Sequence, residues 1–285
     1  MILVTGGGGQ VARALAAASG GRDLRVVGRP DFDFDRPDTL RAVLDAARPS
    51  LVVNAAAYTA VDQAEQEADA AFRANRDGPA ALAAWCAAHG ARLIHISTDY
   101  VFDGTKGAPY VEGDATNPTG VYGASKLAGE LAVLASGARA LILRTSWVYA
   151  ASGRNFVLTM LNAARRTDRL RVVADQHGCP TAAADLAAAI LALADAWDGE
   201  GGGVYHAAGS GATTWHGLAE AVFARAATHG LARPTVTPIA TEDWPTPARR
   251  PADSRLDCRR LGTEFGVTLP AWQDSVARTV DAALA

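Results

Sequence analysis

The feature that most constrains the fold is a run of four glycines, Gly6–Gly9, directly after the short apolar segment Ile2–Thr5. A helical pattern of apolar residues follows from Val11 to Ser19. A strand, a glycine turn and a helix in this order are typical of the first unit of a parallel α/β sheet, where glycine lets the helix pack closely against the strand. The turn also leaves backbone N–H groups free at the helix start, where they can meet an anion.

The same alternation of strand and helix continues through the first half of the chain. Runs of β-branched residues predict strands, and longer stretches with apolar residues at helical spacing predict helices between them. The expected strands span residues 2–5, 24–27, 51–54, 92–97 and 140–144, and the expected helices span residues 11–19, 39–47, 67–89 and 122–134. This order predicts an α/β fold, a Rossmann-type doubly wound parallel sheet whose ligands bind beyond the carboxyl ends of the strands.

The second half of the chain is less regular. Helices are expected at residues 156–166, 185–197, 216–227 and 271–283, separated by glycine- and proline-rich loops with only short strands. We therefore divide the chain into a Rossmann domain, residues 1–146, and a smaller C-terminal lobe formed mainly by residues 147–285. Segments within 171–208 are candidates to return to the main sheet, above all Val204 to Ala207.

Composition excludes several kinds of partner. With 285 residues, 49% of them hydrophobic, the chain can bury a substantial core without disulfides or metals. A net charge of -3 without a run of Lys or Arg predicts no nucleic-acid partner. No apolar stretch reaches the ~18 residues of a membrane helix, and no secretory signal is expected. The three separated cysteines, Cys86, Cys179 and Cys258, fit a reducing compartment, so we expect a cytoplasmic protein in which they are buried or incidental.

The glycine turn has the spacing of a dinucleotide site. Its pattern is Gly6-x-x-Gly9-x-x-Ala12, with the small Ala12 where the fingerprint usually has a third glycine. The expected cofactor contacts at this turn are Gly6, Gly9, Gln10 and Val11. Taken alone the motif is weak, because a glycine-rich turn without a ligand has the same sequence.

Residues after the second and third strands refine this site. Asp33 and Phe34 follow Arg29 after the second strand. An acidic residue here holds the ribose hydroxyls of NADH, whereas an arginine pairs with the 2′-phosphate of NADPH. Both alternatives stay open, and the place of Arg29 nearest the strand end favours NADPH or use of both. The small residues Ala55, Ala56 and Ala57 after the third strand would let a cofactor lie flat.

Three polar residues form a candidate catalytic group. Tyr122 and Lys126 are four residues apart on one face of a predicted helix, and a nearby ammonium favours a phenolate. Thr98 stands at the carboxyl end of the fourth strand. We expect Thr98 to orient a carbonyl oxygen, Tyr122 to protonate it as general acid, and Lys126 to tune Tyr122 and hold the nicotinamide ribose. A lone Tyr-x-x-x-Lys occurs often by chance, so the argument depends on all three together.

At this point the chain resembles the extended branch of the short-chain dehydrogenase/reductase superfamily and, within it, the dTDP-4-dehydrorhamnose reductase family. The resemblance covers nearly the whole chain. Its more specific segments are residues 53–62, 97–104, 117–118, 121–123 and 144–149, and in the second lobe residues 175–181 and 245–251. Agreement at this many ordered places is far more specific than either short motif.

The resemblance implies reduction of the C4 keto group of dTDP-6-deoxy-L-lyxo-4-hexulose to dTDP-L-rhamnose, with NADPH or NADH held by residues 1–146. It also implies that Thr98, Tyr122 and Lys126 are catalytic and that Tyr100 and Trp147 line the sugar pocket. Asp99 is a further candidate for contact with the dTDP-sugar substrate. The candidates for holding its nucleotide and diphosphate are Asn155, Phe156, Gln176, Arg249 and Arg250, since arginine forks suit phosphate.

The chain departs from the family pattern at one place. Some members form a metal-bridged homodimer through carboxylates where this chain has Ala14 and Ala182–Ala184. We therefore predict no metal and a monomer or weak homodimer, with His95 and His206 as strand or pocket residues. A related dehydratase would carry an Asp-Glu pair after the threonine, and Thr98 is instead followed by Asp99 and Tyr100. Another nucleotide-sugar reductase and a non-catalytic dinucleotide-binding regulatory protein are the remaining alternatives.

Overall fold

A computed structural model describes all residues, 1–285, and contains a six-stranded parallel sheet in the order β10-β5-β4-β3-β1-β2. The strands are β1 (Ile2–Thr5), β2 (Leu24–Val26), β3 (Leu51–Asn54), β4 (Arg92–Thr98), β5 (Arg139–Thr145) and β10 (Gly203–His206). Leu3, Val4, Val52 and Val53 are completely buried. Strands buried on both faces are typical of parallel sheets, because helices cover both sides. The predicted doubly wound α/β fold is confirmed.

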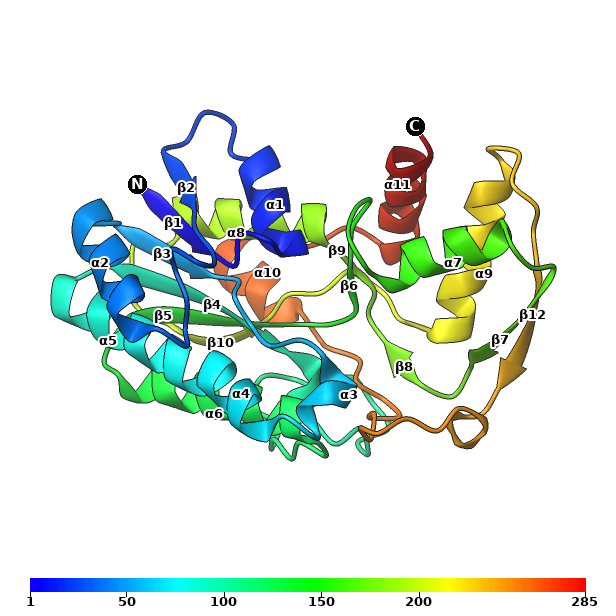
Figure 1. Cartoon of the computed structure of the whole chain (residues 1–285), viewed down its shortest axis with the longest axis horizontal. Helices are drawn as coiled ribbons and strands as arrows, with labels where there is room; N and C mark the ends of the chain where they lie inside the picture. The colour runs from blue at the N-terminus through cyan, green and yellow to red at the C-terminus, as the bar shows by residue number, and fades with distance from the viewer.

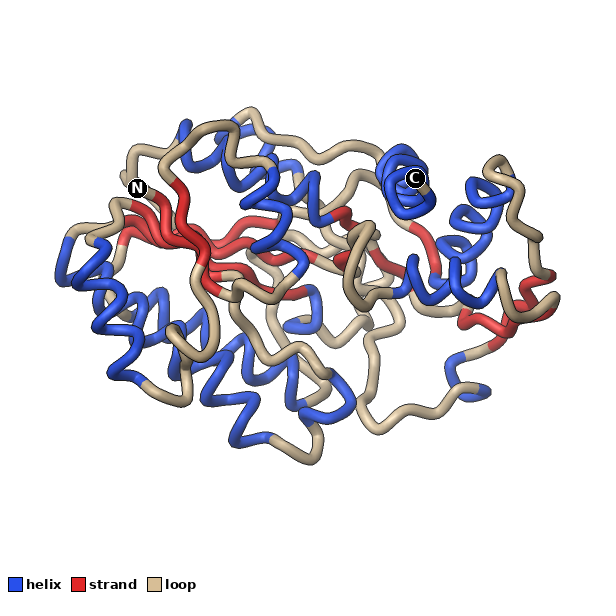
Figure 2. The backbone as a smooth tube through the Cα atoms, turned by 45° about the horizontal axis from the view of Figure 1, so that its top comes forward, coloured by secondary structure: helices blue, strands red, loops and turns tan.

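Two layers of helices enclose this sheet (Figures 1 and 2). One layer contains α1 (Gln10–Ala17), α8 (Ala183–Ala196) and α10 (Arg259–Phe265), which share a core with β1, β3 and β5 through residues such as Leu15, Ile190 and Leu261. The other contains α2 (Pro37–Ala47), α5 (Gly78–His89) and α6 (Val121–Ala135), which bury Leu44 and Leu82. Since α8, β10 and α10 follow residue 146, the sheet lobe recruits segments from the second half of the chain.

A single long helical segment consists of α4 (Ala68–Phe72), the π-helical turn η1 (Arg73–Asp77) and α5. Such π turns are rare and frequently occur at functional sites. Here the turn carries the buried Asn75, whose Oδ1 accepts from the Tyr58 backbone N–H at 2.8 Å and whose Nδ2 donates to Ser125 Oγ at 2.9 Å. The segment therefore ties the loop after β3, including the short helix α3 (Val61–Ala64), to α6.

The second lobe lies beside the sheet lobe (Figure 1). Its core is built from α7 (Phe156–Ala164), α9 (Trp215–Ala227) and α11 (Trp272–Leu284). Three two-stranded ribbons complete it: β7 (Arg169–Val173) with β12 (Thr235–Ile239), β8 (His177–Gly178) with β11 (Thr213–Thr214), and β6 (Val148–Tyr149) with β9 (Thr181–Ala182). The short turns η2 (Asp99–Val101) and η3 (Thr241–Asp243) lie in loops.

Individual elements follow the sequence pattern to different degrees. In the range 171–208 only Gly203–His206 joins the main sheet, whereas β7 pairs with β12 in the other lobe. The strands β7 and β12 and the helix α10 were not predicted. No helix has the length and apolar character needed to cross a membrane. The cysteines are free, Cys86 and Cys179 buried and Cys258 half-buried, and His95 and His206 are buried in β4 and β10.

Candidate active site

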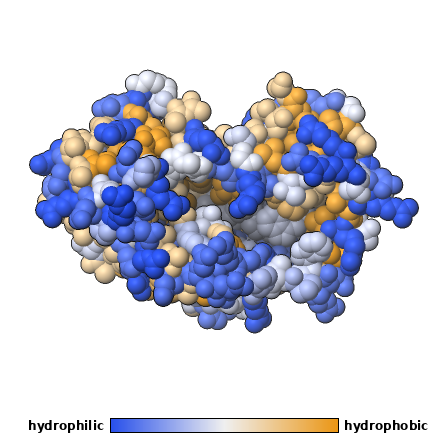
Figure 3. Space-filling model, viewed as in Figure 1, coloured by the Kyte–Doolittle hydropathy of each residue, from blue (hydrophilic) through white to orange (hydrophobic).

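A cleft of about 1050 Å³ lies between the two lobes. Figure 3 shows the outline of the molecule notched between the lobes. The cleft is lined by the loops that follow β1, β2, β3, β4 and β5, by the start of α6 and by Trp215 from α9. Ligand pockets commonly have volumes of roughly 300–1,000 Å³. This cleft therefore has room for a large ligand and a second one beside it.

The glycine turn forms one end of the cleft and leaves no space for a side chain at Gly6. Gly6 has φ +81°, and a Cβ at this position would lie 2.7 Å from the Ala55 carbonyl oxygen. A Cβ on Gly28 would lie 3.0 Å from the Gly7 backbone N. Gly9 precedes α1 and offers no side-chain cap, so the first N–H groups of α1 remain available. These residues fit a dinucleotide, whose pyrophosphate needs close backbone approach and free donors.

Gln10 joins this turn to the second lobe. Its Oε1 accepts a hydrogen bond from Asn155 Nδ2 at 2.9 Å, and its Nε2 donates to the Val148 carbonyl at 3.4 Å. Asn155 also caps α7 by accepting from the Leu158 N–H at 3.1 Å. Asn155 itself does not line the cleft, so its nearest role is to hold the loop after β6 against the glycine turn.

Cations without acidic partners gather at the same end. Arg29, Arg13 and Arg154 line the cleft, and none of them forms an ion pair with a carboxylate. Asp33 and Phe34 line it as well. The Arg13 guanidinium donates to the Gly8 carbonyl at 2.6 Å, which holds it at the glycine turn. Guanidinium groups without a carboxylate partner suit phosphate, which they bind in a planar fork geometry. Arg13 and Arg154 were not among the predicted site residues, because neither stands at a strand end or in a motif.

The catalytic candidates meet at the floor of the cleft. Glu65 Oε1 accepts from the Val121 N–H at 2.9 Å and so caps α6 at its first residue. Tyr122 and Lys126 follow on one face of that helix, and Lys126, only 2% exposed, donates from Nζ to the Ile96 carbonyl at 2.6 Å. Thr98 is the last residue of β4, and its side chain is the hydrogen-bonding neighbour that lowers the pKa of the Tyr122 hydroxyl. All three line the cleft.

The protonation of this group differs from the sequence expectation. Burial raises the pKa of Tyr122 to about 12, and the hydrogen bond with Thr98 acts in the opposite direction. Burial lowers the pKa of Lys126 to about 8, although the Glu130 carboxylate opposes this. We expected the lysine to favour the phenolate. In this state Tyr122 is a protonated phenol instead, as a general acid must be before it reacts.

Asp99 and Tyr100 extend the group on the far side of Thr98. The Thr98 hydroxyl donates to Asp99 Oδ1 at 3.0 Å and accepts from the Tyr100 N–H at 3.2 Å. Burial raises the pKa of Asp99 to about 7, against the hydrogen bonds from Ser254 and Thr98, and its Oδ2 has no partner. The Tyr100 ring packs edge-on against Tyr122 at 5.6 Å between ring centres. Both residues line the cleft.

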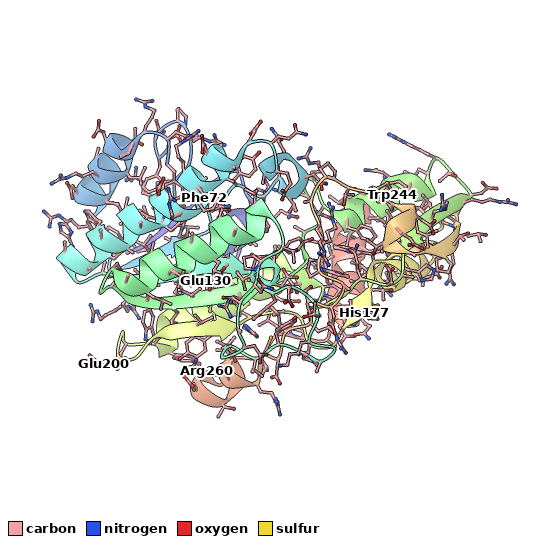
Figure 4. The ribbon with its side chains drawn as sticks, turned by 90° about the horizontal axis from the view of Figure 1, so that it is seen from below. Phe72, Glu130, His177, Glu200, Trp244 and Arg260 are labelled. Atoms are coloured by element: carbon pink, nitrogen blue, oxygen red, sulfur yellow. The ribbon has the colours of Figure 1, made fainter.

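An ionic network supports α6 from below. Glu130 Oε2 lies 2.7 Å from Nη2 of Arg144, and the two side chains are almost fully buried, 2% and 5% exposed. Ser97 donates a further hydrogen bond to Glu130. Figure 4 shows Glu130 on α6 in the middle of the sheet lobe. A buried pair of this kind is costly to break, since removal of one partner leaves an uncompensated charge. It fixes the helix that carries Tyr122 and Lys126.

Aromatic side chains form the other end of the cleft. Trp147 has φ +49° and stacks on Trp215, with ring centres 3.6 Å apart and planes 7° from parallel. Phe156 is tilted against Trp215 at 4.8 Å, and Gln176 Oε1 accepts from Trp215 Nε1 at 3.1 Å. Trp147 and Trp215 line the cleft, while Phe156 and Gln176 stand behind Trp215. Trp215 was missed because it lies far along the chain from Trp147 and in no motif.

The two arginines near the C-terminal loop are not placed as free phosphate ligands. Arg250 forms a two-pronged ion pair with Asp62, at 3.0 and 2.8 Å. Arg249 is exposed, and its carbonyl accepts from Thr119 at 3.3 Å. Neither side chain lines the cleft. The residues brought together in the cleft are Gly6, Gly9, Gln10, Val11, Arg29, Asp33, Phe34, Ala55, Ala56, Ala57, Thr98, Asp99, Tyr100, Tyr122, Lys126 and Trp147.

Comparison with known proteins matches the whole chain to one family. The model of the RmlD substrate binding domain matches residues 1–285. A dTDP-4-dehydrorhamnose reductase of Sinorhizobium fredii is 46% identical over 288 residues, which cover 99% of this chain and 97% of the relative. One from Burkholderia thailandensis is 46% identical over 295 residues, 98% of this chain and 97% of the relative.

Solved structures agree. A dTDP-4-dehydrorhamnose reductase from Clostridium acetobutylicum is 36% identical, with a TM-score of 0.91 over 98% of both chains. One from Bacillus anthracis, in complex with NADP, is 33% identical, with a TM-score of 0.91 over 98% of this chain and 97% of that one. The chain therefore belongs to the RmlD family of extended short-chain dehydrogenases/reductases, together with these dTDP-4-dehydrorhamnose reductases.

Proposed function

We propose that this chain is a dTDP-4-dehydrorhamnose reductase, which reduces the C4 keto group of dTDP-6-deoxy-L-lyxo-4-hexulose to give dTDP-L-rhamnose. The observation that carries the proposal is the meeting of Thr98, Tyr122 and Lys126 in a cleft that runs from a glycine turn to Trp147. A dinucleotide fits at the glycine end, and an aromatic wall suits the apolar side of a deoxysugar.

In the proposed reaction the residues of the chain bind and polarise the ketone. A reduced nicotinamide, when bound, supplies the hydride that forms the new C–H bond at C4. The Thr98 hydroxyl holds the keto oxygen, and the Tyr122 O–H gives it the proton that completes the hydroxyl group. Lys126, beside Tyr122 on α6, is cationic below a pKa of about 8 and stabilises the phenolate that Tyr122 becomes.

The unpaired arginines at the glycine end support NADPH, with NADH as a second cofactor. Arg29 is the proposed partner of the 2′-phosphate, because it lines the cleft without an ion pair. Asp33, in the same loop, is the proposed partner of the ribose hydroxyls when NADH binds.

Among the candidate substrate residues, Asp99, Tyr100 and Trp147 are proposed to contact the sugar directly, since they line the cleft. Phe156 and Gln176 are proposed to support Trp215 from behind. Asn155 is proposed to hold the loop after β6 against Gln10, and Arg250 to act through its ion pair with Asp62. We also propose a monomer or weak homodimer, because Ala14 and Ala182–Ala184 lack the carboxylates of metal-bridged dimers. A cytoplasmic location is proposed as well, from the three separated cysteines.

The test is turnover by the purified protein. We would supply dTDP-6-deoxy-L-lyxo-4-hexulose with NADPH or NADH, follow oxidation of the cofactor and identify the product. We expect dTDP-L-rhamnose, and we expect Tyr122→Phe to lower kcat about 10²–10⁴-fold, the usual contribution of a general acid. Absence of turnover by a protein that binds the cofactor would contradict the proposal.

A further inference from the structure

Trp147 has a backbone conformation that a bulky residue rarely adopts. Its φ of +49° lies in the left-handed region, which is normally occupied by glycine. Such a conformation persists only when its surroundings impose it, and it occurs mainly at functional sites. The contacts that hold Trp147 therefore contribute directly to the shape of this end of the cleft.

The two-stranded ribbon of β8 and β11 supplies two contacts to the Trp147 indole. Gly178 in β8 lies against the indole, so that a Cβ here would be 2.3 Å from Cε2 of Trp147. Gly178 pairs with Thr213 in β11, and Trp215 follows β11 directly. The Trp215 ring stacks on Trp147 at 3.6 Å. One ribbon thus carries the glycine that touches the Trp147 indole and leads directly into the second indole that stacks on it.

Trp215 is itself held on its polar side. Its Nε1 donates to Gln176 Oε1 at 3.1 Å, and Gln176 Nε2 donates to Thr241 Oγ1 at 3.0 Å. Gln176 is only 5% exposed, so this bond is shielded from water. The tilted Phe156 ring, 4.8 Å away, completes the surroundings of Trp215. Trp215 is consequently fixed before any ligand enters the cleft.

We propose that Trp215 is a positioning residue, which holds Trp147 in the orientation that accepts the hexose of the sugar nucleotide. The inference rests on the proposed function, since it needs a sugar at this end of the cleft. Trp215 acts through Trp147, and its loss changes affinity for the sugar nucleotide while the chemistry at Tyr122 continues. Interactions made equally in the ground state and the transition state change KM and not kcat.

The decisive experiment is a double-mutant cycle on Trp147 and Trp215. We expect Trp215→Ala and Trp147→Ala each to raise KM for the sugar nucleotide about ten-fold, as for loss of an aromatic pair, with kcat changed less than about two-fold. If Trp215 acts through Trp147, the double variant has the KM of Trp147→Ala alone. Losses that multiply to about a hundred-fold would overturn the proposal.

Two further variants separate positioning from general structural damage. Trp215→Phe keeps the stacked ring but loses the donor to Gln176, and it should return KM to within about three-fold of the wild type. Gly178→Ala places a Cβ against the Trp147 indole, and it should raise KM in the wild type but not in Trp147→Ala. A Trp215→Phe variant as defective as Trp215→Ala, or an additive Gly178→Ala effect, would contradict positioning through Trp147.

Trp244→Ala is the matched control. Trp244 lies in the same lobe (Figure 4) but is 58% exposed and outside the cleft, so its loss should leave KM unchanged. A wild-type protein that does not turn over the dTDP-keto sugar contradicts the proposed function and not the role of Trp215.

In that case the same double-mutant cycle is measured by calorimetry of dTDP-L-rhamnose binding. Losses of affinity that are not additive support the role of Trp215, whereas additive losses, or no binding, overturn it.

Discussion

The two ends of the cleft are built in different ways. At the cofactor end, the backbone defines the site: Gly6 lies against Ala55 and Gly28 against Gly7, so closely that a Cβ on either glycine has little or no room. At the sugar end, side chains define it: Trp147 depends on Trp215, which depends on Gln176. The first arrangement follows from the sheet itself, while the second needs segments that are distant along the chain.

The ion pairs that support the catalytic helix and the contact between the lobes also differ. The catalytic helix α6 rests on the buried ion pair of Glu130 and Arg144 in the sheet lobe. The second lobe is joined to α3 of the sheet lobe by the Arg250–Asp62 pair, whose side chains are 22% and 41% exposed. A buried pair is costly to break, whereas a partly exposed pair contributes little. The comparison indicates that α6 depends strongly on its ion pair, whereas the contact between the lobes depends little on its own.

The largest expected effect is the loss of stability when the buried ion pair under α6 is broken. Glu130→Gln leaves Arg144 buried without its counter-ion, so we expect the free energy of unfolding to fall by about 3–5 kcal/mol. Denaturant titration measures this. The control is Glu220→Gln, which removes the half-exposed pair with Arg233 and should cost no more than about 1 kcal/mol. Equal losses in the two variants would remove the contrast between the buried and exposed pairs.

Gly6→Ala tests the backbone-defined cofactor end. The added Cβ would lie 2.7 Å from the Ala55 carbonyl oxygen. The alanine would also have to keep the backbone φ of +81°, which costs a residue other than glycine about 1–3 kcal/mol. Binding titrations should show NADPH affinity at least about ten-fold weaker. Gly107→Ala, also at positive φ but with open space around its Cβ position, should leave NADPH affinity unchanged. An unaltered affinity in Gly6→Ala would mean that this close approach does not shape the site.

The pH dependence tests the charge on Lys126. Because burial lowers its pKa to about 8, the ammonium is present below this pH and is lost above it. We expect kcat/KM to fall about ten-fold for each pH unit above 8, as one proton is lost. In Lys126→Arg, whose guanidinium stays protonated, the residual activity should be flat over this range. A wild-type profile without an alkaline decline would contradict the role given to this ammonium.

The smallest effect is expected where the lobes meet. Asp62→Asn removes the charge from the partner of Arg250, and because this pair is partly exposed we expect less than about 1 kcal/mol of lost stability. Thermal unfolding provides the measurement, with KM for the sugar nucleotide measured alongside. A loss of several kcal/mol would show that the second lobe depends on an ion pair as strongly as α6 does.

The same contrast explains how much the sequence predicted. Strand ends are local, so Thr98 at the end of β4 and the glycine turn after β1 were expected where the structure has them. Tyr122 and Lys126 were predictable because helical spacing fixes their face. Trp215 and Gln176 reach the sugar end only through tertiary contacts, and no local pattern marks such contacts. Arg250 looked like a phosphate ligand because its partner, Asp62, lies far away in the sequence.

The protonation of the site was also beyond the sequence. Spacing predicted that Lys126 would favour the Tyr122 phenolate. In the structure, burial raises the pKa of Tyr122 to about 12, and the Asp99 carboxylate acts in the same direction. The ammonium of Lys126 donates to the Ile96 carbonyl. Desolvation depends on the whole cleft and cannot be obtained from two residues on one helix.

The central claim is that hydride reaches C4 of the sugar in this cleft. The most direct measurement uses NADPH that carries deuterium at the reactive carbon of the nicotinamide, with dTDP-6-deoxy-L-lyxo-4-hexulose as substrate. We predict dTDP-L-rhamnose with one deuterium at C4 of the hexose, found by NMR and mass spectrometry. A product with no deuterium, or with deuterium at another carbon, would contradict the assignment of this protein as a C4 ketoreductase.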